Sequence, residues 1–402
     1  MRTPAATTTK GRHYRQRGTP ILLSRLHLDR HQAAALAPEV FLIEACPGAG
    51  KTRAIVERYR LRAERKHQGI ALVSFTNAAV DEVSLRCSST PEAMQAPHFV
   101  GTIDTFLHRY IVTPYDTARL SVAPRYLQSW SELPTGASSL KVGSTQYATM
   151  PLSDFAHDSS GTIQLLPAGL SNRYFRQATG PQQADVQTRG AARIRKLNDT
   201  GLYDSDSARY RALQILRDAS SATLRSALSA RFAEIIVDEF QDCAAIEHEL
   251  IAELRAIGIH VVVVADPDQA IFGFRHSEER LYEDFRGRLK DSQIVKLNKN
   301  YRSTVAICSL VSSLRHHGRG EIESTRNISE ERNPSCIYLL AGDERSIQAR
   351  FIELADQWQI PHGQRYSLAH KSAEAKSQAS GGEPSLKRSL AFTTNLLREL
   401  QS

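Results

Sequence analysis

The chain has 402 residues, 41% hydrophobic and 23% charged, as in a soluble globular protein of two or three domains, and its net charge of +8 favours nucleic-acid partners. No apolar run approaches the roughly 20 residues that cross a bilayer, and residues 1–25 lack the apolar core of a secretion signal, so we expect a cytoplasmic protein with no membrane partner. The five cysteines show no C-x-x-C spacing, so neither a zinc site nor a disulfide framework is indicated.

Residues 1–25 predict a disordered basic arm. The first acidic residue of the chain is Asp29, and no apolar periodicity precedes it. The basic residues of the arm are Arg2, Lys10, Arg12, Arg15, Arg17 and Arg25. Such an arm could bind the phosphates of a nucleic acid or be a tail without function. An organelle transit peptide has a similar composition.

The segment Phe41–Thr52 has the pattern of a buried strand, a glycine-rich loop and the start of a helix. Ala45 stands where the strict phosphate-loop pattern has its first glycine. In this arrangement backbone N–H groups and the helix dipole hold phosphate charge. Lys51 is expected to reach the terminal phosphates of ATP, and Thr52 to place its hydroxyl on Mg²⁺. The loop residues expected to contact the nucleotide are Pro47, Gly48, Ala49 and Gly50.

Further short apolar runs alternate with helical patterns along the chain. Such alternation predicts an α/β fold with a parallel, doubly wound sheet. The strands expected after the loop are residues 70–75, 98–103, 234–237, 260–265 and 293–297.

An acidic pair follows the strand expected at residues 234–237. Asp238 would hold the same Mg²⁺ ion as Thr52, and Glu239 would activate water. The glycine-rich loop and this pair together predict nucleotide hydrolysis.

Changes of pattern divide the chain into parts. Residues 26–112 and 227–318 are expected to form the ATP-binding lobe, interrupted by an inserted, mostly helical subdomain over residues 113–226. Residues 305–317 predict a helix that closes this lobe. Residues 319–402 would form a linker and a partial second lobe, with strands at 336–340 and 366–370 and a helix at 344–357.

The order and spacing of these motifs resemble the UvrD, Rep and PcrA family of superfamily 1 DNA helicases. The segments that carry the resemblance are Leu28–Ala35, Ser74–Val83, Gly101–Phe106, Asp238–Asp242, Ala265–Arg275 and Leu297–Ser303. The resemblance implies a RecA-like lobe in which Gln32 reads the adenine edge and Tyr301 stacks on the base. It further implies that Gln269 senses the terminal phosphate and that Arg302 acts as an arginine finger.

The same resemblance implies contacts with single-stranded DNA, whose bases stack on aromatic side chains. The residues concerned are Phe75, Thr76, Asn77, Thr102, Phe272 and Phe274. Alternating Phe272 and Phe274 would also fit one buried face as core aromatics. The sequence departs from the family at Asp104, where a histidine is usual, and at Ala265, where a glycine is usual.

Three functions are compatible with these motifs, because two later motifs of the family's second lobe are not found before Ser402. The first is an ATP-dependent DNA translocase or helicase, moving 3′ to 5′ by resemblance, whose second lobe is minimal, divergent or supplied by a partner protein. The second is a non-motor ATP- and DNA-binding subunit of a repair or defence complex. The third is a truncated, inactive helicase.

Overall fold

The computed structural model describes residues 28–65, 68–88, 90–143, 148–158, 160–269, 279–315, 320–325 and 343–365. The chain divides into two compact units, residues 1–297 and residues 298–402. The sequence had placed the start of the second lobe at residue 319, and its domain bounds stay predictions.

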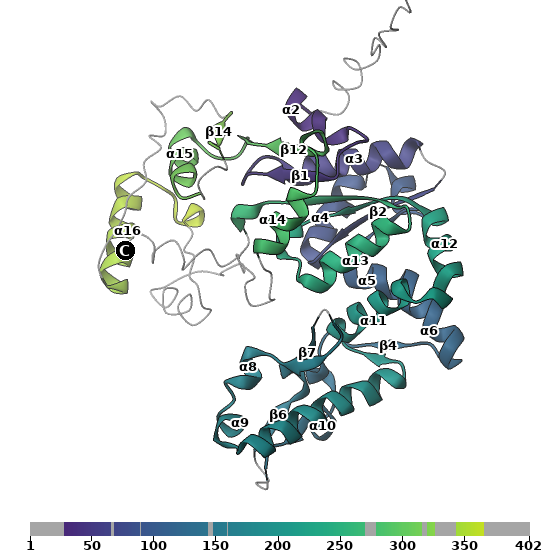
Figure 1. The fold of residues 1–402 in the computed structure, drawn as a ribbon. Coiled ribbons are helices and arrows are strands. Elements are labelled where there is room, and N and C mark those ends of the chain that lie inside the picture. The colour runs from purple at the N-terminus through teal and green to yellow at the C-terminus, as the bar shows by residue number, and fades with distance from the viewer. Residues whose placement is uncertain are drawn as a thin grey trace, which may run out of the picture. The chain divides into compact units, whose positions relative to one another are not determined.

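A six-stranded parallel sheet forms the centre of the first unit (Figure 1). Its spatial order is β12-β1-β11-β10-β2-β3. The strands are β1 (Leu42–Ala45), β2 (Gly69–Ser74), β3 (Phe99–Thr102), β10 (Phe232–Val237), β11 (His260–Ala265) and β12 (Ile294–Leu297). Each coincides with an expected strand to within two residues, which confirms the predicted α/β class.

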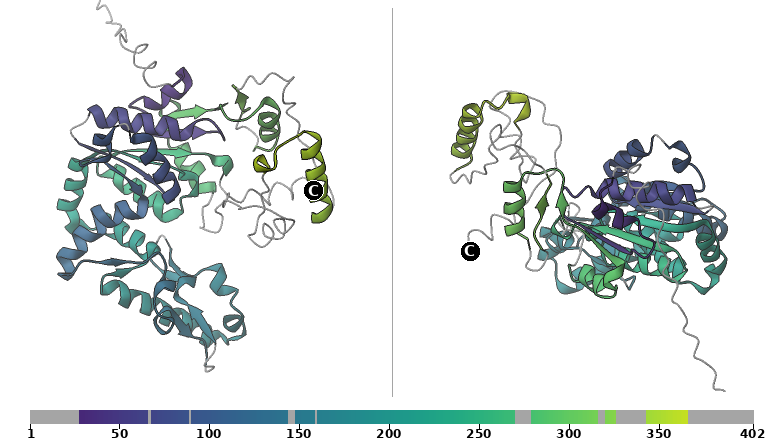
Figure 2. Two further views of the ribbon diagram at one scale, coloured as in Figure 1. Left: turned by 180° about the vertical axis from the view of Figure 1, so that it is seen from behind. Right: turned by 90° about the horizontal axis from the view of Figure 1, so that it is seen from above.

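The central strands are mostly apolar and buried because helices cover both faces of the sheet (Figure 2). All six residues of β2 are buried, and so are five of the six in β11. The helices of this layer are α3 (Lys51–Arg65), α4 (Asn77–Cys87), α5 (Ile103–Leu107), α13 (Ala245–Ala256) and α14 (Glu279–Gly287).

The sheet order brings segments that are distant in the sequence to one edge. β11 lies between β1 and β10, so the loops that follow these three strands are neighbours at their carboxyl ends. In open parallel sheets this edge is where ligands bind.

The segment between β3 and β10 contains more strand than the sequence predicted. Its helices are α6 (Thr113–Leu120), α7 (Thr135–Ser138), α8 (Pro167–Leu170), α9 (Arg173–Gln177), α10 (Gly180–Asp199), α11 (Ser205–Arg217) and α12 (Ala222–Arg231). Three strand pairs accompany them: β4 (Arg125–Tyr126) with β9 (Leu202–Tyr203), β5 (Ser139–Lys141) with β6 (Thr149–Pro151), and β7 (Phe155–His157) with β8 (Ile163–Leu165). These strands have only two or three residues each, too few to show a period of two.

Apolar clusters on one face of the sheet and in the inserted segment contribute to the stability of the first unit. The larger core includes this face of the sheet and the buried face of α11, with Ala208, Ala212 and Leu216. A smaller core surrounds Trp130 and packs one face of α10 against the short strands. Helix α11 therefore belongs to the sheet's core although it lies in the inserted segment.

The second unit contains β13 (Lys299–Asn300), α15 (Val305–Ser313), β14 (Glu323–Ser324) and α16 (Glu344–Gln357) among its described residues. The helix expected at 344–357 is confirmed, whereas the one expected at 305–317 ends at Ser313. The expected basic arm and the strands at 336–340 and 366–370 lie outside the described residues. Across the described ranges, no helix combines the length and the apolar character needed to span a membrane.

Candidate nucleotide site

The loop after β1 is shaped by two glycines in the left-handed region. Gly48 has φ of 75° and Gly50 has φ of 74°, values that favour glycine. At Gly50 an added Cβ atom would also lie 2.5 Å from Nε2 of Gln32. The loop then enters α3 at Lys51, so the N–H groups of a helix start face the end of β1.

Lys51 lies against the acidic pair that follows β10. Its Nζ contacts Oε2 of Glu239 and is 3.5 Å from Oδ1 of Asp238. Burial opposes the charge of Lys51, but the two carboxylates outweigh burial and raise the pKa of the ammonium above its ordinary value. Lys51 therefore stays protonated at the point where the phosphate loop enters α3.

Asp238 is buried at the end of β10, where its backbone N–H donates to the carbonyl of Val73 at 2.9 Å. Burial raises its carboxyl pKa to about 6, although the nearby Lys51 works in the opposite direction. The next residue, Glu239, has φ of 57° and ψ of 42°. This left-handed conformation is uncommon for a residue other than glycine, and such strain clusters at functional sites.

A chain of side-chain hydrogen bonds connects Glu239 to the segment after β11. Nε2 of Gln241 donates to Oε2 of Glu239 at 2.7 Å, and the backbone N–H of Asp266 donates to Oε1 of Gln241 at 3.0 Å. Nε2 of Gln269 then donates to Oδ2 of Asp266 at 2.6 Å. Burial raises the carboxyl pKa of Asp266 to about 7.

The sequence assigned no role to Gln241 or Asp266. The sequence does show an amide side chain, Gln241, two residues after Glu239. It could not show that the oxygen of this amide would accept a hydrogen bond from the backbone of Asp266. Gln269 lies at the end of this chain of hydrogen bonds, and its role as a sensor of the terminal phosphate stays a prediction.

Gln32 lies on the phosphate loop. Its side chain is buried, and Nε2 donates to the carbonyl of Ala49 at 3.0 Å. Gln32 belongs to the short helix α2 (Arg30–Ala33), which Asp29 caps: its Oδ1 accepts the backbone N–H of Gln32 at 2.7 Å. Recognition of adenine by Gln32 stays a prediction.

The oxygen donors expected for Mg²⁺ have the right chemistry. Thr52 is the second residue of α3, next to Lys51, and Asp238 directly follows β10 with its Oδ1 3.5 Å from Nζ of Lys51. A hydroxyl and a carboxylate are hard oxygen ligands of the kind that Mg²⁺ takes together with nucleotide phosphates. These residues therefore fit the ion.

Four of the expected DNA contacts lie at the carboxyl ends of the adjacent strands β2 and β3. Phe75 is half-buried and packs against the larger core, and Asn77 is exposed. Thr76 caps α4 by accepting the N–H of Ala79, and Thr102 caps α5 in the same way. The other two expected contacts, Phe272 and Phe274, lie outside the described residues.

Asp104 takes part in a partly buried ion pair. Its carboxylate accepts from Nε and Nη2 of Arg209 on α11, at 2.7 and 3.0 Å. Nη1 of Arg209 is 2.8 Å from the buried Glu247 of α13. The carboxylate at this position thus joins α5 to two other helices.

Tyr301 and Arg302 belong to the second unit. Oδ1 of Asn300 accepts the N–H groups of Arg302 and Ser303, both at 2.7 Å, and forms a local turn. Tyr301 is 37% exposed. The roles of Tyr301 and Arg302 at the nucleotide stay predictions.

Comparison with known proteins places this site in a family context. The family model described as UvrD/REP helicase N-terminal domain matches residues 27–290. DNA helicase II of Escherichia coli is 25% identical over 304 residues, which cover 75% of this chain and 42% of that protein. The ATP-dependent DNA helicase srs2 of Schizosaccharomyces pombe is 25% identical over 293 residues, 68% of this chain and 32% of that protein. The Gabija protein GajB of Bacillus cereus is 23% identical over 325 residues, 79% of this chain and 54% of that protein. The chain thus spans about a third to a half of the length of these relatives.

Proposed function

The chain belongs to the UvrD/REP helicase family, and we propose that it hydrolyses ATP to ADP and phosphate on single-stranded DNA, as a translocase or helicase. The observation that carries the proposal is the position of Lys51, between the phosphate loop and the carboxylates of Asp238 and Glu239. A cation, an acidic pair and a glycine-rich helix start are the parts that phosphoryl transfer requires.

When nucleotide binds, the ion pair between Lys51 and Glu239 would open, and the two side chains would take different roles. Lys51 stays protonated because of its acidic neighbours, so it can exchange Glu239 for the terminal phosphates. Glu239 is then available to orient water and accept its proton. Its left-handed backbone, followed by the buried Phe240–Asp242 turn, fixes the direction of the carboxylate.

Thr52 and Asp238 would hold Mg²⁺ in the proposed site. When bound, the ion would neutralise developing charge on the phosphate oxygens. The buried Asp238 has a raised pKa, and a cation beside it favours the ionised carboxylate that a metal ligand requires.

The hydrogen bonds of Gln241 suggest how DNA could influence hydrolysis. They join Glu239 to Asp266 and thereby to Gln269, which precedes the segment expected to carry the DNA contacts Phe272 and Phe274. A shift of that segment on DNA would move the carboxylate that activates water. This route supports DNA-stimulated rather than constitutive hydrolysis.

Movement from 3′ to 5′, adenine stacking by Tyr301 and the finger role of Arg302 are part of the proposal and rest on the resemblance. A partner that completes the second lobe and a cytoplasmic location are proposed from the sequence. The alternatives of a non-motor subunit and of an inactive helicase predict no DNA stimulation.

Steady-state ATP hydrolysis by the full chain, with and without single-stranded DNA, tests the proposal. We expect strong stimulation by DNA. The Lys51→Ala variant is the control, because any hydrolysis that it retains does not come from this site. Hydrolysis at the same rate with and without DNA would contradict the motor function and favour the alternatives.

A further inference from the structure

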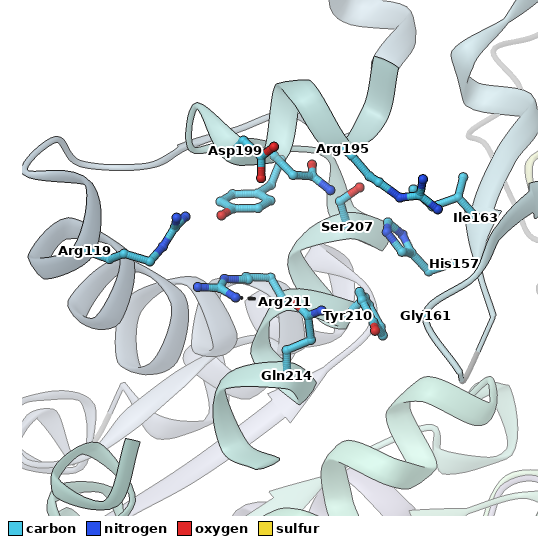
Figure 3. Close-up of a pocket in the computed structure, with 12 residues that line it drawn as sticks. Arg119, His157, Gly161, Ile163, Arg195, Asp199, Ser207, Tyr210, Arg211 and Gln214 are labelled. Atoms are coloured by element: carbon cyan, nitrogen blue, oxygen red, sulfur yellow. Dashed lines mark hydrogen bonds between the residues drawn. The ribbon is translucent and has the colours of Figure 1, made fainter. Parts of the chain in front are cut away.

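A polar cavity lies in the inserted segment and is not explained by ATP hydrolysis. It has a volume of about 270 Å³, close to the lower end of small-molecule sites, which run from about 300 Å³ upward. Figure 3 shows Arg119 on one side of it and Arg195 with His157 on the other, with residues of α11 between them. Three arginines therefore line one small cavity.

Two of these arginines are fixed in place by one buried carboxylate. Asp116 accepts from Nε of Arg119 at 2.9 Å and from Nη2 and Nε of Arg211 at 2.6 and 3.0 Å. The hydroxyl of Tyr203 donates to the same carboxylate at 2.6 Å. Each guanidinium has five N–H donors, so donors remain after Asp116 is satisfied. This arrangement holds cationic donors in position before a ligand arrives.

The cavity also contains buried polar atoms that lack a partner. Ser207 is 1% exposed, and within the described part of the chain its Oγ has no hydrogen-bond partner. Oδ1 of Asn198, which also lines the cavity, is in the same situation among the described residues. An amide can present either its oxygen or its nitrogen to a ligand. Buried groups of this kind are uncommon in proteins and point to a missing ligand or water.

One wall of the cavity is rigid. The rings of His157 and Tyr210 stack with centroids 4.7 Å apart and planes 15° apart, and Asp206 lies 2.9 Å from Nδ1 of His157. Gly161, with φ of 87°, packs directly against Tyr210 in this wall. A side chain would not fit there, because a Cβ atom would lie 1.7 Å from the hydroxyl of Tyr210.

Three of the four charged side chains that line the cavity are arginines, Arg119, Arg195 and Arg211, and the fourth is Asp199. Two carboxylates lie behind this lining: that of Asp116, which binds two of the arginines, and that of Asp206, which lies beside His157. Arg195 on α10 is exposed and is the lining arginine outside the Asp116 cluster. Arginine forks match the oxygens of phosphate, and a serine hydroxyl can donate to the same group.

We propose that this cavity binds a terminal phosphate group, carried either by the 5′ end of a DNA strand or by a free mononucleotide. Arg195, Arg119 and Arg211 would contact the phosphate oxygens, and Ser207 would donate its free hydroxyl. The stacked rings of His157 and Tyr210 would border the attached sugar. The site is separate from the phosphate loop and does not depend on ATP hydrolysis.

The test compares binding of two short single-stranded oligonucleotides, one with a 5′-phosphate and one with a 5′-hydroxyl, to the full chain without nucleotide. A second experiment measures the binding of dAMP to the same protein by titration calorimetry. Arg195→Ala and Ser207→Ala alter the cavity without disturbing Asp116. Arg193→Ala is the matched control, because Arg193 is exposed on the same helix and does not line the cavity.

Tighter binding of the 5′-phosphorylated strand, reduced about tenfold in Arg195→Ala and Ser207→Ala but kept in Arg193→Ala, would assign the site to strand ends. Equal binding of the two strands, together with dAMP binding that shows the same dependence on the variants, would assign it to free nucleotides. The proposal is overturned if neither probe responds to Arg195→Ala and Ser207→Ala. It is also overturned if Arg193→Ala has the same effect, because general surface charge would then explain the binding.

Discussion

Replacing Asp266 with asparagine should stabilise the protein at alkaline pH. Asp266 is 2% exposed, and burial raises its pKa to about 7 from an ordinary value of 3.8. The folded state therefore favours the protonated carboxyl. This contribution to stability is fully present below about pH 4 and is lost as pH rises through about 7, a loss of about 4 kcal/mol.

The asparagine side chain carries no charge, so it removes this loss. It also gives up one of the two hydrogen bonds that the Asp266 carboxylate accepts, from Gln269 and from the N–H of Asp268, at a cost of about 1 kcal/mol. The net expectation for Asp266→Asn is a gain of about 3 kcal/mol at pH 8 and a small loss at pH 4.

Urea denaturation monitored by circular dichroism at pH 4 and pH 8 measures this difference. The matched control is Asp81→Asn, which changes an exposed carboxylate on α4. If wild type and Asp266→Asn lose the same stability between the two pH values, the carboxyl of Asp266 is not the group that titrates, and the reasoning fails.

Arg209→Ala should lower the free energy of unfolding by about 3–5 kcal/mol because it leaves the buried Glu247 without its cation, whereas Arg217→Ala, which breaks ion pairs on the surface, should cost about 1 kcal/mol or less. Similar losses in urea denaturation of the two variants would contradict this. Lys51→Ala should abolish binding of a fluorescent ATP analogue, and unchanged affinity would overturn the assignment of the loop. Gln241→Ala should reduce DNA-stimulated turnover about 10²-fold while ATP affinity is kept, because Glu239 loses its orienting amide; a wild-type rate would show that the hydrogen-bonded chain is not used.

The parts of the fold that the sequence predicted are those encoded by neighbouring residues. The strand expected at 260–265 and the helix expected at 344–357 have the observed bounds, because continuous apolar runs and 3.6-residue periodicity are local patterns. The phosphate loop is local as well, since its glycines and Lys51 are contiguous.

Features that depend on spatial neighbours were not visible. The link from Gln241 to Asp266 exists because β10 and β11 are adjacent in the sheet, which the chain order alone does not state. Asp104 could be recognised only as a departure from the family, because its partner Arg209 lies 105 residues further along the chain. The cavity beside Ser207 likewise needs α6, α10, α11 and the β7–β8 hairpin to assemble first.

The most direct test of the account is to measure ATP binding and ATP turnover in the same preparation of Glu239→Gln. The amide keeps the size of the side chain but cannot accept a proton from water. We predict ATP affinity within a few-fold of wild type and loss of DNA-stimulated turnover by about 10²-fold or more. Turnover at the wild-type rate would show that Glu239 is not the base and would contradict the proposed mechanism.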